Sequence, residues 1–185
     1  VRKVAPALAA GCTVVLKPAT QTPVCAVLLA ECVHAAGVPP AVFQVIVGPS
    51  AAFGEELLSN PLCRKITFTG STETGKQLLC AAAGTVKRMS MELGGNAPFI
   101  VFDDADIDAA VNGAIVAKFR NAGQTCICTN RLYVQSGIHD RFIARFAARA
   151  AALCVEPGDE PGAEQGPLID LAALTRIETF VADAV

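Results

Sequence analysis

The sequence predicts an α/β fold in which a parallel β-sheet is connected and covered by helices and leads into a second α/β domain. Short apolar runs rich in β-branched residues alternate with helix-length segments between Thr13 and Met91. This order favours a parallel sheet, because each parallel connection needs a crossover segment. Of the 185 residues, 52% are hydrophobic and 17% are charged, so much of the chain must be buried.

In the first half, short strands alternate with longer helices. The predicted strands are residues 13–16, 43–47, 65–69 and 86–91, and the predicted helices are residues 23–36, 51–59 and 71–83. The chain opens within an expected amphipathic helix and closes within another at residues 180–185. We therefore expect it to be a fragment of a longer protein.

In the second half, strands are predicted at 98–102 and 131–135, helices at 109–118 and 138–152, and a surface loop at 157–167. Asp103, Asp104 and Asp106 precede the first of these helices. Their spacing is not that of an EF-hand, and acids at a helix N-terminus commonly act as caps and dipole partners. No metal site is expected.

The composition argues against several classes of partner. No apolar run reaches the roughly 18 residues of a membrane-spanning helix. The net charge is −2, and no basic run indicates nucleic acid or a membrane surface. Eight cysteines in a core-rich chain without a secretory signal favour a reducing compartment over a disulfide framework. We expect a cytoplasmic protein, or a mitochondrial matrix protein if eukaryotic, whose partners are small molecules.

Three predicted strands end at residues typical of a nucleotide site, because ligands of open parallel sheets bind at the carboxyl ends of strands. Lys17 follows the first strand, and a glycine turn at Gly48 follows the second. The third runs into Gly70 and Ser71, where a helix N-terminus favours a phosphate. None contains the full G-x-G-x-x-G fingerprint, so a generic α/β domain without a ligand is the alternative.

A polar stretch at residues 123–128, Gly-Gln-Thr-Cys-Ile-Cys, contains the candidate nucleophile Cys126. A thiol reacts as its thiolate, which a tight turn near a helix end or a cation favours. Gly123 supplies the predicted turn and Arg120 the cation. The other six cysteines stand among Ala, Val and Leu, so only Cys126 and Cys128 are expected to be exposed. Alternatively, both are small apolar residues.

Cys128 is a candidate redox switch. With Ile127 between them in a predicted extended loop, Cys126 and Cys128 should project to the same side. A disulfide across a single residue would be strained and therefore easily reduced. The alternative is that Cys128 only packs beside the nucleophile.

The candidate general base is Glu92, in the segment Ser-Met-Glu-Leu-Gly-Gly-Asn at residues 90–96. Its apolar neighbours and the glycines that follow give a desolvated and mobile setting, which suits a base that accepts a proton from water. The alternative is an ordinary surface carboxylate beside a turn.

The segments from Met91 to Asn96 and from Phe119 to Cys126 resemble the two signatures of the aldehyde dehydrogenase superfamily. The resemblance extends over essentially the whole chain and is closest to the succinate-semialdehyde dehydrogenases. It implies the aldehyde dehydrogenase fold, with part of a Rossmann-like NAD(P)-binding domain at residues 1–93 and part of the catalytic domain at 94–185. The family's oxyanion-hole asparagine and a ribose-binding glutamate lie in parts absent here, so this chain alone is expected to be inactive.

The resemblance also implies roles for individual residues in an enzyme that oxidises an aldehyde with NAD⁺ or NADP⁺ and forms a dimer or tetramer. Cys126 would be the nucleophile and Glu92 the base that activates the hydrolytic water. The implied cofactor-binding residues are Lys17, Ala19, Thr20, Gly48, Gly54, Gly70, Ser71, Thr72, Gly75 and Leu93.

Substrate and cofactor choice follow from three positions. The succinate-semialdehyde branch uses arginines that match Arg120 and Arg2, although Arg120 could equally serve the dipole of the preceding helix. Many relatives carry a glutamate where this chain has Thr20, and that glutamate would repel a 2′-phosphate. Because Thr20 is neutral, we expect the enzyme to accept NADP⁺ and to prefer it. The alternatives are another semialdehyde such as glutarate semialdehyde, transfer of the acyl group to coenzyme A, or a non-catalytic binding or structural protein of the same fold. Glu92 argues against the coenzyme A reaction, since hydrolysis needs that base.

Overall fold

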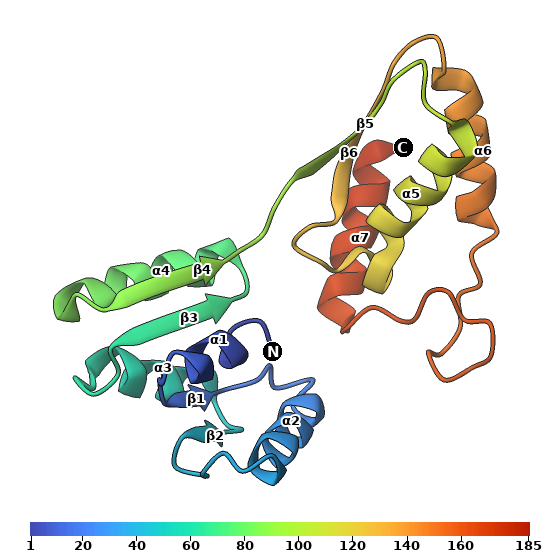
Figure 1. Cartoon of the computed structure of the whole chain (residues 1–185). Helices are drawn as coiled ribbons and strands as arrows, with labels where there is room; N and C mark the ends of the chain where they lie inside the picture. The colour runs from blue at the N-terminus through green and yellow to red at the C-terminus, as the bar shows by residue number, and fades with distance from the viewer. The chain divides into compact units, whose positions relative to one another are not determined.

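The structure, a computed structural model, describes all 185 residues, which divide into two compact units (Figure 1). The first unit is Val1–Leu93 and the second is Gly94–Val185. This division falls at the boundary that the sequence suggests between the two domains. Their assignment to cofactor binding and to catalysis stays a prediction.

The first unit contains two parallel strand pairs with crossover helices. Strand β1 (Val14–Leu16) pairs with β2 (Phe43–Val45), and β3 (Lys65–Thr69) pairs with β4 (Arg88–Glu92). The helices are α1 (Val4–Ala9), α2 (Val24–Ala35), α3 (Ser50–Ser59) and α4 (Thr72–Ala82), with a short 3-10 turn at Ala83–Thr85. Helix α2 connects β1 to β2, and α4 connects β3 to β4. The predicted parallel α/β order is confirmed.

One feature of the first unit differs from the expected covered sheet. Ladder hydrogen bonds join β1 only to β2 and β3 only to β4, so the four strands form separate pairs. In β3, Ile66 is buried while its neighbours Lys65 and Thr67 are exposed. This alternation is typical of a strand with one covered face.

The core of the first unit forms around Phe43, which is fully buried with Val4 and Ala30. The His34 ring meets the Phe43 ring edge-on at 6.4 Å, and its Nε2 lies 2.9 Å from the Phe43 carbonyl oxygen. These contacts hold α2 against β2, and thereby set the position of the chain that leaves β1.

The second unit is built on the parallel pair of β5 (Ala97–Val101) and β6 (Thr129–Val134), connected by α5 (Ile107–Phe119) and a 3-10 turn at Arg120–Gly123. Helix α6 (His139–Ala151) packs with α5 on this pair through a core that includes Val101, Ile115 and Phe142. The closing helix predicted at residues 180–185 overlaps the end of α7 (Leu171–Ala184), which begins earlier than expected.

The acidic stretch before α5 acts as predicted for a helix start. The Ala109 backbone N–H donates to Oδ1 of Asp106 at 2.9 Å, so Asp106 is the N-cap of α5. The cap fixes where α5 begins. The cap thereby helps to fix the position of residues 120–128, which follow the C-terminal end of α5.

The loop between α6 and α7 is tied back to α6. Arg149 of α6 forms an ion pair with Glu164, whose other carboxylate oxygen accepts from the Cys154 backbone N–H at 3.2 Å. The hydrogen bond from Arg149 is the main reason that the pKa of Glu164 lies below its usual range.

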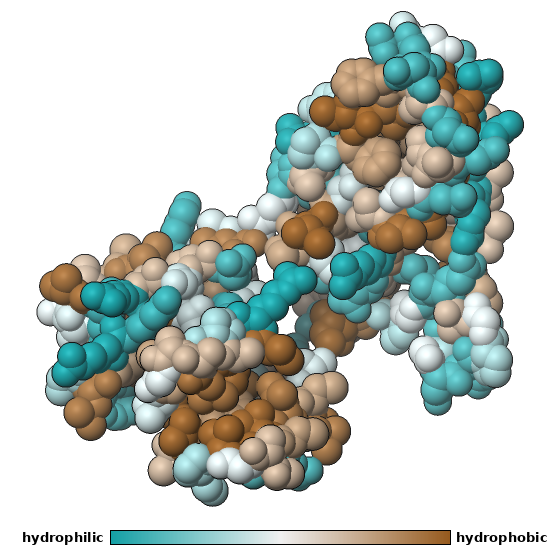
Figure 2. Space-filling model, viewed as in Figure 1, coloured by the Kyte–Doolittle hydropathy of each residue, from teal (hydrophilic) through white to brown (hydrophobic).

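None of the helices combines the length and apolar character that a membrane crossing requires. Large apolar side chains nevertheless reach the surface in both units (Figure 2), among them Leu28 of α2 and Phe180 of α7.

Candidate active site

The candidate nucleophile Cys126 lies in the connection between α5 and β6, at residues 120–128, which we call the nucleophile loop. Three successive residues at its start have positive φ: Asn121 at 53°, Ala122 at 54° and Gly123 at 73°. The turn predicted at Gly123 is confirmed. Since alanine avoids this region at a cost of roughly 1–2 kcal/mol, the surrounding contacts must hold the loop in this conformation.

Cys126 lies in a β-turn. The Cys128 backbone N–H donates to the Thr125 carbonyl oxygen at 3.2 Å, which places Cys126 and Ile127 at the two central positions. Both are exposed, Ile127 to 64%. The thiol of Cys126 is therefore accessible in this structure.

The expected arrangement of Cys128 was wrong. Cys128 is only 4% exposed, and its thiol donates to the Lys118 carbonyl oxygen at 3.3 Å while Lys118 Nζ lies 3.6 Å from the sulfur. The loop turns between the cysteines rather than running extended, so one side chain is exposed and the other is buried. Exposure also fails to single out this pair, because Cys12, Cys25, Cys32, Cys80 and Cys154 are exposed as well.

The side-chain amides of Asn121 and Gln124 form hydrogen bonds within the nucleophile loop, and Gln124 also forms one with a distant segment. Asn121 Nδ2 donates to the Gln124 carbonyl oxygen at 3.3 Å, and Gln124 Nε2 donates back to the Asn121 carbonyl oxygen at 3.2 Å. Gln124 Oε1 accepts from the Ile169 backbone N–H at 3.0 Å. The sequence gives Gln124 no signal beyond its place beside the cysteine, so its partner at Ile169 could not have been found from spacing.

Gly95 lies against the backbone of the nucleophile. A Cβ atom built on Gly95 would lie 2.5 Å from the Cys126 carbonyl oxygen, closer than van der Waals contact allows. The clash is with the main chain and not with a movable side chain. Gly95, the second glycine after Leu93, is therefore needed because the two backbones lie so close together. The sequence had suggested a different reason for these glycines, namely mobility of the segment after Glu92.

The arginines expected at the substrate are both exposed. Arg120 is the C-cap of α5 and opens the nucleophile loop. Arg2 lies just before α1, in the first unit. The position of Arg120 suits both of the roles considered for it, the helix dipole and an anionic substrate.

Glu92 is the last residue of β4 and is exposed. It pairs with Thr69 of β3, and its carbonyl oxygen accepts from the Gly70 backbone N–H at 3.1 Å. Lys3, which belongs to no motif in the sequence, interacts electrostatically with Glu92. Partial burial lowers the pKa of Lys3, and the negative charge of Glu92 opposes that shift. A lysine close in space to the candidate base has no signature in sequence spacing.

The residues expected to bind the cofactor follow strand ends in the first unit. Lys17 follows β1 and donates from Nζ to the Pro18 carbonyl oxygen at 2.9 Å, and Ala19 and Thr20 after it are exposed. Gly48 lies between β2 and α3, whereas Gly54 lies within α3.

At the third strand end, Gly70 follows β3 and Ser71 caps α4 by accepting from the Thr74 backbone N–H at 3.2 Å. The first helical residue, Thr72, is exposed at this helix end. The helix N-terminus at the carboxyl end of a parallel strand fits the phosphates of a dinucleotide.

Gly75 and Leu93 contact each other. A Cβ on Gly75 would lie 2.6 Å from Leu93 Cδ2, so this buried glycine lets α4 approach the chain that leaves β4. The contact explains why Gly75 is small. The expected role of both residues at the cofactor stays a prediction.

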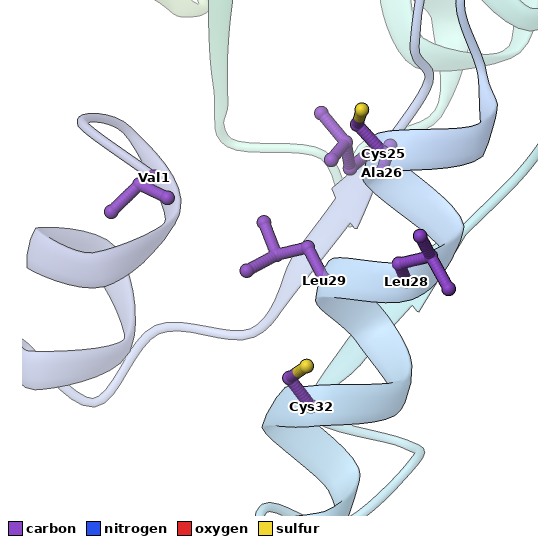
Figure 3. Close-up of a pocket in the computed structure, with 7 residues that line it drawn as sticks. Val1, Cys25, Ala26, Leu28, Leu29 and Cys32 are labelled. Atoms are coloured by element: carbon purple, nitrogen blue, oxygen red, sulfur yellow. The ribbon is translucent and has the colours of Figure 1, made fainter.

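An apolar hollow of about 460 Å³ lies along α2 (Figure 3). It is lined by Val1, Leu16, Cys25, Ala26, Leu28, Leu29 and Cys32. None of the predicted site residues lines it, and none of the side chains that line it is charged. This hollow is therefore not the candidate active site.

The whole chain, residues 1–185, matches the model of the aldehyde dehydrogenase family. The chain belongs to this family. Its relatives include glutarate-semialdehyde dehydrogenase of Pseudomonas aeruginosa and the NADP(+) succinate-semialdehyde dehydrogenase of Escherichia coli, each 57% identical over 184 residues. A 3-sulfolactaldehyde dehydrogenase of Pseudomonas putida is 55% identical over 184 residues. Each alignment covers 100% of this chain and 38% of the relative.

Solved structures agree with this assignment. An Escherichia coli NADP-dependent enzyme superposes with a TM-score of 0.96 at 57% identity, over 99% of this chain and 38% of that one. An NAD-dependent aldehyde dehydrogenase from Sinorhizobium meliloti superposes with a TM-score of 0.90 at 39% identity, over 93% of this chain and 34% of that one. The aldehyde dehydrogenase fold is thereby confirmed, for a chain that spans between 34% and 38% of the length of these relatives.

Proposed function

We propose that the full-length protein oxidises a semialdehyde to the carboxylic acid with NAD⁺ or NADP⁺, with Cys126 as the nucleophile. The observation that carries the proposal is Cys126 itself, an exposed thiol in a β-turn, held within a motif that resembles the family's catalytic signature. The names of the similar enzymes support a semialdehyde as the substrate class.

In this mechanism the Cys126 thiolate adds to the aldehyde carbon. The resulting alkoxide is stabilised by N–H donors, and the backbone N–H of Cys126 is one candidate. Bound NAD(P)⁺ would supply the hydride acceptor, and loss of hydride leaves a thioester on Cys126. Glu92 takes a proton from water, the water attacks the thioester, and the acid and the free thiol are released.

The residues of the first unit fit a dinucleotide. The N-terminus of α4 beside Gly70 presents backbone N–H groups and the positive end of the helix dipole, which suit phosphate groups. The end of β1 would bind the adenosine ribose, through the residues that follow the strand: Lys17, Ala19 and Thr20. In our proposal Gly48, Gly54, Thr72, Gly75 and Leu93 shape the same site.

For the substrate we propose succinate semialdehyde, with glutarate semialdehyde as the alternative. Succinate semialdehyde, glutarate semialdehyde and 3-sulfolactaldehyde, the aldehydes in the names of the similar enzymes, all carry an anionic group remote from the aldehyde carbon. Arg120 is an exposed cation in the same loop as Cys126 and can pair with such a group. Arg2 is proposed as a second cation for it.

A burst experiment on the full-length enzyme tests the proposal. Cys126→Ala should abolish both the burst of cofactor reduction and steady turnover. Glu92→Gln should keep the burst and lose steady turnover, because the thioester forms but is not hydrolysed. A burst that survives Cys126→Ala would contradict the nucleophile. Absence of both a burst and steady turnover in the parent enzyme with any aldehyde would favour a non-catalytic protein, and an acyl-coenzyme A product would favour the acylating alternative.

A further inference from the structure

We propose that Gln124 is a positioning residue, which holds the nucleophile loop in the geometry that presents Cys126. The proposal rests on the proposed role of Cys126 as the nucleophile. Gln124 stands two residues before Cys126 and does not itself need to touch the substrate.

Both ends of the Gln124 amide are engaged. Its Oε1 accepts from the Ile169 backbone N–H at 3.0 Å, and its Nε2 donates to the Asn121 carbonyl oxygen at 3.2 Å. An amide with both groups engaged has one orientation, so Gln124 works as a brace and not as a mobile surface side chain. The brace joins the left-handed start of the loop to a segment 45 residues later.

That later segment is anchored to a regular element. Asp170 follows Ile169 directly and caps α7, since its Oδ1 accepts from the Ala173 backbone N–H at 2.8 Å. Gln124 therefore connects the nucleophile loop to the start of a helix of 14 residues. The other contacts described for the loop are the Asn121–Gln124 pair, the Cys128 contact with Lys118 and the close approach of Gly95 to Cys126, and none of these is a hydrogen bond to a distant segment.

The loop needs such a brace because its backbone is unfavourable. Asn121 and Ala122 both have positive φ without being glycine, and such conformations persist only where neighbouring contacts over-determine them. Nucleophilic attack is sensitive to position, and a displacement of about 1 Å can reduce the rate about a hundredfold. A loosened loop should therefore slow the addition step much more than it weakens cofactor binding.

The experiment compares glutamine substitutions in the full-length enzyme. Gln124→Met keeps the length of the side chain and removes both hydrogen bonds. We expect its burst rate to fall about tenfold or more, with the KM for the cofactor within about twofold of the parent. Gln124→Glu keeps an acceptor for the Ile169 N–H and should lose less.

Gln135 provides the matched control in the same unit. Its Oε1 accepts from the Asp103 backbone N–H at 2.8 Å. Gln135 directly follows the last residue of β6, whereas the nucleophile loop precedes the first residue of β6. Gln135→Met removes the same kind of bond, and its burst rate should stay within about twofold of the parent. Thermal unfolding of both variants separates lost stability from lost positioning.

A burst rate of Gln124→Met within about twofold of the parent, or a fall no larger than that of Gln135→Met, would overturn the proposal. If Gln124→Met does not fold, Gln124→Leu, which also removes both hydrogen bonds, is judged against Gln135→Leu by the same criterion. Cys126→Ala distinguishes the two failures. A burst that persists in Cys126→Ala refutes the role of Cys126 as the nucleophile. A burst that is lost in Cys126→Ala but unchanged in Gln124→Met refutes only the positioning role of Gln124.

Discussion

Gly95 shows how one missing side chain can be needed at the candidate site. Gly95→Ala would place a Cβ 2.5 Å from the Cys126 carbonyl oxygen, so the turn that carries the nucleophile must shift. We expect kcat of the full-length enzyme to fall about a hundredfold, the scale of a 1 Å displacement of a reacting group.

The matched control is Gly158→Ala, since no atom lies within 4 Å of a Cβ at Gly158. This variant should keep its activity. If Gly95→Ala and Gly158→Ala were equally active, the close approach of Gly95 to the nucleophile would have no catalytic importance.

Arg120 is the residue that should decide between charged and uncharged substrates. Its guanidinium is exposed in the loop of Cys126 and is free to pair with a remote carboxylate. Arg120→Ala should reduce kcat/KM for succinate semialdehyde by about tenfold or more, with a much smaller effect on an uncharged aldehyde of similar length. Equal losses for the two aldehydes would leave only the role at the helix dipole.

Thr20 should decide the choice of cofactor. It is exposed just after β1 and carries no charge that would repel a 2′-phosphate. We expect the parent enzyme to accept and prefer NADP⁺, and Thr20→Glu to shift the preference towards NAD⁺. The ratio of kcat/KM values for the two cofactors measures this, and a strong native preference for NAD⁺ would refute it.

At the scale of elements, the nucleophile loop governs whether Cys128 can act as a redox switch. Cys128 is buried on the Lys118 carbonyl oxygen, so a bridge to Cys126 requires the turn at Thr125–Cys128 to open. We still expect mild oxidant to inactivate the enzyme through this bridge, a dithiol to restore it, and Cys128→Ala to stay active.

Peptide mass mapping of the inactive protein tests the switch. A Cys126 to Cys128 bridge supports it. Cys126 recovered as sulfenic or sulfonic acid, with Cys128 still a free thiol, would show ordinary oxidation of an exposed thiol instead.

The same scale shows why most elements could be predicted. Apart from α7, which begins at Leu171 and not at residue 180, the predicted strands and helices lie within a few residues of the expected ranges, and Asp106 caps α5 as its position suggested. Both signals are local, because they depend on residues within a few positions of each other. The pairing of β1 only with β2, and β3 only with β4, depends on distant parts of the chain and was not predicted.

At the scale of the whole molecule, the chain spans 38% of the length of its aldehyde dehydrogenase relatives and leaves large apolar side chains at its surface (Figure 2). We expect residues 1–185 alone to be inactive with any aldehyde, and the full-length protein, expressed in parallel, to be an active dimer or tetramer. Turnover and sedimentation of both preparations check this. Turnover by residues 1–185 alone would show that the site is complete within them.

The sequence by itself determined the family, the α/β class, the turn at Gly123 and the identity of the candidate nucleophile and base. These depend on motifs and on local conformational preference, which a single chain carries in its order of residues. Only the tertiary structure decided that Cys128 is buried, that Gly95 lies against Cys126 and that Gln124 reaches Ile169. Burial and contacts between residues far apart in sequence arise when the chain packs, so no local pattern encodes them.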